Sequence, residues 1–376
     1  MPEPFKNFFN TKIIRGMAKH FQRQWPDFDS KGFTKTASKN LDALELKERS
    51  DQIMNAMVSY LPSDFNKAGE IILASLSPAQ QGDITDVTVD NKGIAGWAIM
   101  PITHYVGMYG QDHFDISMTL FKELTKRFTA EFGIRFFLLS SPKKTLSTLK
   151  KWSKDKDRHV RRLVSEGTRP RLPWAMQLPL FIKDPSPVIE LLELLKDDDE
   201  EYVRRSVANS LNDIAKDHPK IVANISKQWM KGASSDREKL IRHACRTLIK
   251  KGDKKVLKVF GYAPPVIHKA VIKMNTPKVV FGTALEFTLS ISSDAKHKQA
   301  LLIDYIVHHQ KANGKTSPKV FKWQNKTLAA NGTLTSTKKH PIKKITTRVY
   351  YPGVHTVEVM VNGTSVATAD FQLLMP

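Results

Sequence analysis

The chain of 376 residues has little cysteine and no long apolar segment. Its single cysteine, Cys245, excludes an internal disulfide framework and is typical of a reducing compartment. No run of about 18 apolar residues occurs, so the sequence predicts no membrane-spanning helix. The first residues contain no apolar segment that leads to a small-residue cleavage site. We therefore expect a cytoplasmic protein rather than a secreted one.

The motifs of several enzyme classes are missing as well. The 12 histidines show no metal-ligand spacing, so we expect neither a metal ion nor another cofactor. The glycines at Gly93 and Gly96 are not followed by Lys-Ser or Lys-Thr, which excludes a phosphate-binding loop of the Walker type. No Gly-x-Ser-x-Gly or comparable nucleophile motif is present.

What the sequence has in excess is positive charge. Lys and Arg number 59 against 37 Asp and Glu, which gives a formal net charge of +22. An excess of this size attracts polyanions. Nucleic acid is the first class of partner that it indicates, and an anionic membrane surface is the second.

The first 260 residues have helical periodicity. Apolar residues recur at three- and four-residue spacing in 5–24, 41–60, 114–139, 199–217 and 236–251. A weak repeat lies within this part, because Val160, Val203 and Ile241 each precede a pair of basic residues and open a one-faced apolar stripe. A period near 40 is typical of HEAT-like helical pairs, which stack into an array with an extended concave face.

The periodicity changes near Pro264 and Pro265. Short β-rich runs follow in 266–273, 285–291, 301–307, 354–361 and 365–373. Asn362-Gly363, between the last two runs, is a strong hairpin signal. We expect about seven strands in an immunoglobulin-like sandwich. The sequence thus predicts a mainly α protein, with a helical-repeat domain over 1–262 and a small all-β domain over 266–376.

The segment 158–179 starts as a repeat helix and then breaks its own pattern. Its first part reads RHVRRLVSEGTRPRLPW and brings a carboxylate, further arginines, prolines and a tryptophan where a second tidy helix would follow. The break favours chemistry or binding over packing. Three acidic residues stand out in this basic chain. They are Glu166 in this segment, Glu131 on an expected apolar helix stripe, and Asp213 on a helix flank with Arg205.

Each of these residues also has a structural interpretation. Glu131 could pair with Arg127 or Arg135, one helical turn away on either side. Asp213 could be a solvated residue or a capping partner, and Trp174 could be a core anchor. Pattern alone favours the structural interpretation for each of them.

Three pieces of the sequence resemble the HEAT-like repeat DNA alkylation glycosylases, and specifically their AlkC branch. The pieces are RFTAEFGIR at 127–135, RHVRRLVSEGTRPRLPW at 158–174 and VRRSVANSLND at 203–213. The resemblance covers about residues 1–260, and the second piece is the specific one. Some members of the family also carry a C-terminal immunoglobulin-like domain, in agreement with the β-rich tail.

The resemblance implies an enzyme of base-excision repair. Its expected reaction is hydrolysis of the N-glycosidic bond of cationic alkylated bases in DNA, such as 3-methyladenine and 3-methylcytosine. By motif position it assigns the active site to Glu131, Glu166, Trp174 and Asp213, with no cofactor. The implied partner is double-stranded DNA that contains alkylated bases, bound by a monomer in the bacterial cytoplasm or nucleoid.

Arginines beside the repeat core are the expected contacts to the DNA backbone. They are Arg161, Arg162, Arg169, Arg171, Arg204, Arg205 and Arg242. Two other interpretations remain. A non-catalytic HEAT-repeat protein that binds nucleic acid or recognises damage accounts for the charge and the repeats equally well, but it leaves Glu166 and Asp213 without a role. A protein–protein scaffold with the β-domain as its docking module predicts weak salt dependence and no DNA affinity.

Overall fold

The computed structural model describes residues 4–79, 82, 84 and 87–375. The chain divides into two compact units. The first comprises residues 1–218 and 233–244, and the second comprises residues 219–232 and 245–376. Helices make up the first unit, whereas the second joins a few helices to a β-sandwich. This mainly helical region followed by a sandwich confirms the fold class predicted from the two periodicities.

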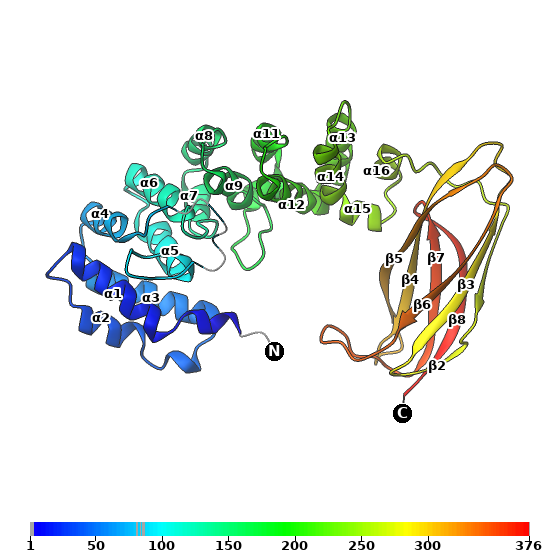
Figure 1. Ribbon diagram of the computed structural model, residues 1–376, viewed down its shortest axis with the longest axis horizontal. Coiled ribbons are helices and arrows are strands. Elements are labelled where there is room, and N and C mark those ends of the chain that lie inside the picture. Colours follow the sequence, from blue (N-terminus) through cyan, green and yellow to red (C-terminus); the bar gives the residue numbers. More distant parts are fainter. Residues whose placement is uncertain (1–3, 80–81, 83, 85–86, 376) are drawn as a thin grey trace. The chain divides into compact units, whose positions relative to one another are not determined.

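The first unit is a layered array of helices. Its helices are α1 (Thr11–Gln24), α2 (Ser30–Ala37), α3 (Leu46–Tyr60), α4 (Phe65–Ser75), α5 (Ile99–Tyr109), α6 (Phe114–Thr125), α7 (Ile134–Ser140), α8 (Pro142–Trp152), α9 (Arg158–Gly167), α10 (Pro179–Lys183), α11 (Ser186–Leu195), α12 (Glu201–Asp217) and α14 (Ser235–Ala244). Helices α9, α12 and α14 pack side by side in one row, while α8 and α11 lie in the other (Figure 1).

The apolar stripes of the repeat are the reason for this row. Val160 and Val164 of α9 are fully buried, and so are Val203 and Val207 of α12. Residues four apart lie on one face of a helix, so each stripe packs against its neighbours in the stack. The N-cap of α9 is Asp157, whose carboxylate accepts hydrogen bonds from the backbone N–H groups of residues 159 and 160.

One predicted helix is broken. The sequence predicts continuous helical periodicity over 114–139, but α6 ends at Thr125 and α7 begins at Ile134. The Arg127 guanidinium donates to the carbonyl oxygen of Glu123 (2.7 Å) and so satisfies the end of α6. Gly133 then passes so close to the Thr103 carbonyl that a Cβ would lie 2.2 Å from its oxygen. Glu131 therefore lies on a turn, and its predicted place on an apolar helix stripe is wrong.

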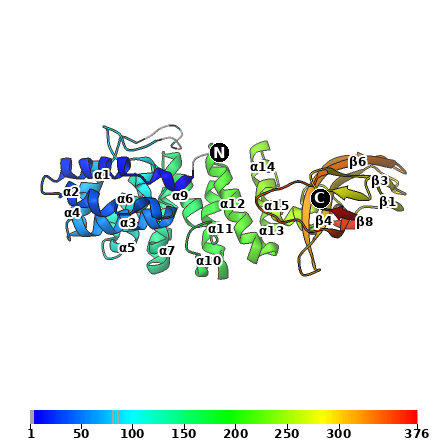
Figure 2. The ribbon, with the colours of Figure 1, turned by 90° about the horizontal axis from the view of Figure 1, so that it is seen from below.

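The second unit contains an antiparallel sandwich. A three-stranded sheet has the order β1 (Lys269–Met274), β3 (Ala284–Ser292) and β6 (Thr333–Pro341). A five-stranded sheet has the order β2 (Lys278–Val280), β8 (Thr364–Leu374), β7 (Gly353–Val361), β4 (Gln299–Gln310) and β5 (Thr316–Leu328). Strands β2 and β8 pair in parallel, and the other strand pairs described within the sandwich are antiparallel. Figure 2 shows strands of both sheets.

The apolar side chains that alternate along the predicted strands fill the space between the two sheets. Phe287 and Leu289 of β3 are fully buried, as are Val357 and Val359 of β7. The predicted hairpin joins β7 and β8, and Asn362 (φ 47°) and Gly363 (φ 74°) both have the positive φ that a type I′ turn requires. Strands β2, β5 and β6 were outside the predicted runs, because the exposed faces of β5 and β6 give them little apolar content.

Helices α13 (Pro219–Trp229), α15 (Arg246–Lys250) and α16 (Lys254–Val259) belong to the second unit. Leu257 of α16 and Tyr262 form a small apolar cluster with Leu302 of β4. The Asn362 side chain donates to the carbonyl oxygen of Ala263 at 2.7 Å. The last helical residues are therefore packed on the sandwich. None of the helices in the described part of the chain is long and apolar enough to span a membrane.

Buried histidines lie among the aromatic rings of the sandwich. His340 is stacked edge-on against Phe321 with 4.6 Å between ring centroids, and its Nδ1 lies 2.9 Å from the Tyr305 hydroxyl. Burial, with a smaller contribution from Lys338, lowers the pKa of His340 to about 4. The pKa of His355 is lowered too, mainly by burial. The native sandwich thus holds these rings neutral.

We expect the sandwich to lose stability as the pH falls from about 6.5 towards 4. An unfolded histidine titrates near its ordinary pKa of ~6.5, so the unfolded chain binds more protons than the native one in this window. For His340 the loss is about 2–3 kcal/mol. A side-chain NMR titration of the folded protein should place the midpoint of His340 far below 6.5, and the variant H340Q should flatten the pH dependence of urea unfolding. A His340 midpoint near 6.5 would contradict this account.

Candidate active site

Three carboxylates predicted from sequence lie in one network of charges in the first unit. Glu131 comes from the turn between α6 and α7, Glu166 from the last turn of α9, and Asp213 from the middle of α12. All three are buried, with 9%, 5% and 2% of their surface exposed. Arg162 and Arg169 connect them by ion pairs. The structure therefore brings together residues that are up to 82 positions apart in the sequence.

Glu166 has hydrogen-bond partners on both carboxylate oxygens. Its Oε1 accepts from Arg169 Nη1 (2.6 Å), and its Oε2 accepts from the Ser206 hydroxyl (2.6 Å). Arg162 Nη2 lies 3.7 Å away. Burial alone would raise the pKa of Glu166, but the two guanidinium groups and the hydroxyl outweigh it, so the pKa lies below its ordinary value. Glu166 is an ionised carboxylate at neutral pH.

Arg169 joins α9 to α12. Its Nε donates to Asp213 Oδ2 at 2.8 Å while its Nη1 donates to Glu166. Asp213 Oδ1 accepts from Lys216 Nζ at 2.9 Å. Burial alone would lower the pKa of Arg169, but the carboxylates of Glu166 and Asp213 raise it by more. The pKa therefore lies above its ordinary value, and this guanidinium stays charged. Asp213 is thus neither solvated nor a helix cap, the two structural roles that its sequence position allowed.

Glu131 faces a different partner from those that its sequence neighbours suggested. Its Oε2 accepts from Arg162 Nη1 (3.0 Å) and from the Thr129 hydroxyl (2.7 Å). Arg127 pairs instead with Glu123, and Arg135 donates to backbone carbonyls. Within the described residues, Glu131 Oε1 has no hydrogen-bond donor. One of its two oxygens therefore remains available to a ligand or water.

Trp174 lies on the loop 168–178 that follows α9. Its side chain is 74% exposed, and its backbone has φ 65°, a conformation that a bulky residue rarely adopts. Its ring stands edge-on to that of Phe5, with 6.4 Å between centroids. A core anchor would be buried, so the core-anchor interpretation fails. Strained, exposed residues of this kind concentrate at ligand-binding sites.

Arg135 holds the loop in place from below. It is fully buried in α7 and donates to the carbonyl oxygens of Gly167 (2.9 Å), Arg169 (2.8 Å) and Met176 (2.8 and 2.5 Å). Burial is also the main cause that lowers the pKa of Arg135 to about 10. One guanidinium thus fixes both ends of the loop that presents Trp174. The sequence indicated Arg135 only as a partner for Glu131.

A cavity of about 390 Å³ opens beside Glu131. Aromatic rings form much of its wall, with Phe8 stacked on Trp97 at 5.2 Å and Phe128 next to Trp97. Glu131 and Arg162 lie on its lining together with Tyr202. The Arg162 guanidinium is 4.9 Å from the centroid of the Tyr202 ring. The cavity offers flat apolar faces and one carboxylate, which suits a planar cation.

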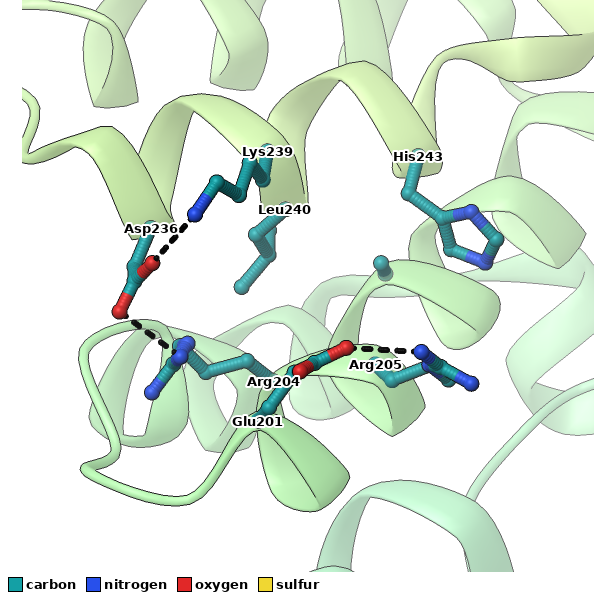
Figure 3. A pocket seen from close by; sticks show the side chains of 8 residues that line it. Glu201, Arg204, Arg205, Asp236, Lys239, Leu240 and His243 are labelled. Carbon is teal, nitrogen blue, oxygen red and sulfur yellow. Dashed lines mark hydrogen bonds and ion pairs between the residues drawn. The ribbon is translucent and has the colours of Figure 1, made fainter.

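Most of the arginines predicted to contact DNA are bound to carboxylates of the chain itself. Besides Arg162 and Arg169, Arg161 pairs with Asp198 (2.6 Å) and Arg171 with Asp217 (2.8 Å). Figure 3 shows the pocket between α12 and α14, where Arg204 pairs with Asp236 and Arg205 with Glu201. Arg242 lies near the end of α14. Arg205 is the most exposed of the ion-paired ones, at 67% of its side chain.

Two of these arginines tie successive repeats together. Arg161 donates to the backbone carbonyls of residues 155 and 156 and to Asp198 of the following repeat. Arg204 repeats the pattern on the carbonyls of residues 198 and 199 and on Asp236. The same contact one repeat further along the chain shows that these side chains set the spacing of the stack.

Sequence reasoning missed Ser206, which donates to Glu166 and accepts from the hydroxyl of Ser165 at 2.7 Å. The two serines are 41 residues apart, one repeat length, and each follows an arginine-rich helix start. That spacing was the available signal. No group of three or more His, Cys, Asp or Glu side chains in the described ranges is arranged to hold a metal ion.

Comparisons with known proteins cover both units. Residues 128–248 match the family model described as DNA alkylation repair enzyme, and residues 268–375 match the C-terminal Ig-like domain of YhaZ, a family described as uncharacterised. The uncharacterised protein YhaZ of Bacillus subtilis strain 168 is 36% identical over 370 residues, which are 98% of this chain and 99% of that protein.

A solved structure is similar over the whole chain. It is the Pseudomonas fluorescens alkylpurine DNA glycosylase AlkC, bound to DNA that contains an abasic site analogue. The two proteins are 33% identical and superpose with a TM-score of 0.86, over 99% of this chain and all of that one.

Removing the Arg135 guanidinium should loosen the loop 168–178. Arg135→Met would leave three buried carbonyl oxygens without their donor, which costs about 3–5 kcal/mol of the free energy of unfolding. Urea denaturation measures the loss. Arg205→Met is the matched control, because its exposed ion pair contributes about 1 kcal/mol or less. Equal losses in the two variants would show that Arg135 does not anchor the loop.

Proposed function

The chain belongs to the AlkC branch of the HEAT-like repeat DNA alkylation repair enzymes with a C-terminal Ig-like domain, and on that basis we propose that it is a monofunctional DNA glycosylase. In this proposal it hydrolyses the N-glycosidic bond of cationic alkylated bases, such as 3-methyladenine and 3-methylcytosine, in double-stranded DNA. It acts as a monomer and without a cofactor.

The observation that carries the proposal is the buried network of Glu131, Glu166 and Asp213. Buried carboxylates cost free energy unless they are paired, and here each one forms an ion pair with an arginine. The three carboxylates share Arg162, Arg169 and the half-exposed Lys216. Because they lie next to a strained and exposed tryptophan, we assign them the stabilisation of positive charge on a ligand.

The chemistry of alkylated bases requires this kind of stabilisation. The methylated base already carries a positive charge, so the C1′–N bond breaks with its electron pair moving to nitrogen, and the base leaves as a neutral molecule. The positive charge passes to the deoxyribose as an oxocarbenium ion. Preorganised carboxylates beside the sugar lower the barrier to that step. Water then bonds to C1′ and gives up a proton, which leaves an abasic site.

The contacts support a division of labour among the four residues. Both oxygens of Glu166 and of Asp213 accept hydrogen bonds, so in our proposal these two act as fixed negative charges. Glu131 keeps Oε1 available beside the cavity, and we assign it the orientation of the attacking water. Trp174 offers an exposed aromatic face to the cationic base or sugar.

We propose that the predicted arginines contact the DNA backbone, with Arg205 the most exposed of the ion-paired ones and Arg169 the most buried. Arg161, Arg162, Arg169, Arg171, Arg204, Arg205 and Arg242 form this set. The net charge of +22 and the DNA-bound state of AlkC support a DNA partner. Because carboxylates already hold most of these arginines, phosphates would share or displace them, and binding should depend steeply on salt.

Substituting the charged oxygens should separate catalysis from binding. Glu166→Gln and Asp213→Asn keep the shapes of the side chains but remove the negative charge, so each should slow excision about 100-fold or more. Affinity for DNA should stay equal or rise, because the carboxylates oppose the phosphates. The assay is single-turnover release of free 3-methyladenine from methylated duplex DNA.

Glu201→Gln is the control for this pair, since Glu201 is an exposed carboxylate that is paired with Arg205 of the same helix. It should excise at the rate of the unchanged protein. Wild-type rates from both active-site variants would refute the assignment. Failure of the unchanged protein to release any base would favour a non-catalytic DNA-binding protein.

For the domains we propose a glycosylase domain over 1–262 and an Ig-like domain over 266–376. The latter carries 15 Lys and Arg against 5 Asp and Glu, so it holds +10 of the net charge. Removing residues 263–376 should therefore lower DNA affinity and excision, more on duplex than on gapped DNA. Leu257 lies against Leu302 in the whole chain, so circular dichroism must first show that the shortened chain is folded. Full activity on duplex DNA would contradict this role.

A further inference from the structure

A second basic surface lies outside the carboxylate network. The groove between α1 and α2 has a volume of about 510 Å³ and is lined by Arg15 and Lys19 of α1 and by Lys31 and Lys35 of α2. We propose that this α1–α2 groove binds the phosphodiester backbone of the DNA strand that flanks the lesion. The inference rests on the proposed function, because it names a further part of the same DNA-binding surface.

The geometry of the two helices makes the groove. Helices α1 and α2 pack against each other at one end of the helical array of the first unit (Figures 1 and 2). Arg15 and Lys19 are four residues apart, as are Lys31 and Lys35, so each pair projects from one face of its helix. All four side chains are exposed. Thr11 and Gln22 extend the lining with uncharged polar groups.

The charge of the groove is uncompensated. No Asp or Glu lies on its lining, and none of the four cations has an ion-pair partner in the part of the chain that the structure describes. The nearest acid in sequence to α2, Asp29, caps that helix by accepting from the backbone N–H of Gly32. Like charges one turn apart destabilise a helix, and no acidic side chain on the lining offsets this cost. Unfavourable pairs of like charges that no contact within the protein offsets point to an anionic ligand.

The pocket between α12 and α14 shows the difference. There Arg204, Arg205 and Lys239 meet Glu201 and Asp236, and Figure 3 shows each basic group bound to a carboxylate. Such a pocket is nearly balanced in charge, whereas the α1–α2 groove is positive throughout. Of the two, the α1–α2 groove is the one whose cations are available to phosphates without first breaking an ion pair.

Helix α1 links the groove to the proposed active site. Ile13, in its first turn, lines the same cavity as Glu131, and Arg15 and Lys19 follow on the same helix. With a rise of ~1.5 Å per residue, Lys19 lies roughly 9 Å along the axis from Ile13. Ile13 and the groove residues lie on opposite faces of α1, because two residues turn a helix by ~200°. A strand that reaches the groove therefore runs past α1 and not through the cavity.

The spacing of the cations suits a nucleic acid strand. The basic residues of each pair are ~6 Å apart along the helix axis. Phosphates of one strand rise ~3.4 Å per nucleotide along the duplex axis and also turn about it, so neighbouring phosphates are roughly 6–7 Å apart, about the spacing of the paired cations. Contacts to phosphates do not distinguish one base from another, so the groove should bind DNA of any flanking sequence with the same affinity.

The test is a full-length variant with Arg15, Lys19, Lys31 and Lys35 all changed to Gln. Its affinity for an undamaged duplex should fall at least about tenfold, and the slope of log affinity against log salt should become shallower by roughly 2 to 4. Single-turnover excision at saturating enzyme should stay unchanged, since none of the four residues belongs to the carboxylate network.

A matched variant controls for net charge. Lys143, Lys150, Lys151 and Lys154, on α8 and the turn after it, are exposed lysines of the same unit and also remove four charges when changed to Gln. Melting curves should show that both variants are folded. If the α8 variant loses as much affinity and slope as the groove variant, the site is overturned.

Lysine acetylation gives a second readout that needs no substitution. Bound duplex should protect Lys19, Lys31 and Lys35 from the reagent while Lys150 and Lys151 react as before. Equal reaction in free and bound protein would overturn the proposal. Binding is measured on undamaged DNA, so a protein that binds through the groove but releases no base would refute the glycosylase and leave the groove site standing.

Discussion

The buried bridge that Arg169 makes between Glu166 and Asp213 is the interaction on which the candidate site depends. Taking three charged groups out of water costs several kcal/mol per ion, and their attraction barely offsets it, so such a bridge is poor evidence for stability. An apolar contact between α9 and α12 would hold the stack at least as well. The bridge therefore makes sense as a means of fixing two carboxylates where, in our proposal, charge develops on a ligand.

Arginine has two different roles in the first unit. Arg161 and Arg204 bind loop carbonyls and a carboxylate of the next repeat, and so act as spacers of the stack. In the α1–α2 groove, by contrast, the basic side chains meet no acid. Only part of the net charge of +22 is therefore available to bind phosphates, because many arginine side chains already form ion pairs with carboxylates of the protein. Counting basic residues overstates the surface that can attract phosphates.

The sequence was enough for the fold class, because apolar spacing is a local pattern. The carboxylates are assigned through the family resemblance, since pattern alone favours a structural role for each, and their catalytic role stays a proposal. Apolar spacing predicts the helices, and Asn362-Gly363 predicts the hairpin that the structure contains. Contacts between residues far apart in the chain could not be predicted from the sequence. The partner of Glu131 is Arg162, 31 residues away, and not an arginine one helical turn away. The predicted helix is broken at 126–133, where Gly133 approaches the Thr103 carbonyl closely, and no local pattern encodes that approach.

The position of Trp174 follows from the same kind of distant contact. A tryptophan after a proline is ordinarily buried, yet this one is exposed with positive φ, on a loop whose carbonyls near both ends accept hydrogen bonds from Arg135. The strain at Trp174 is thus balanced by hydrogen bonds in the core below it. A loop fixed in this way loses little entropy when a ligand binds, so an exposed ring can serve as a rigid surface for stacking.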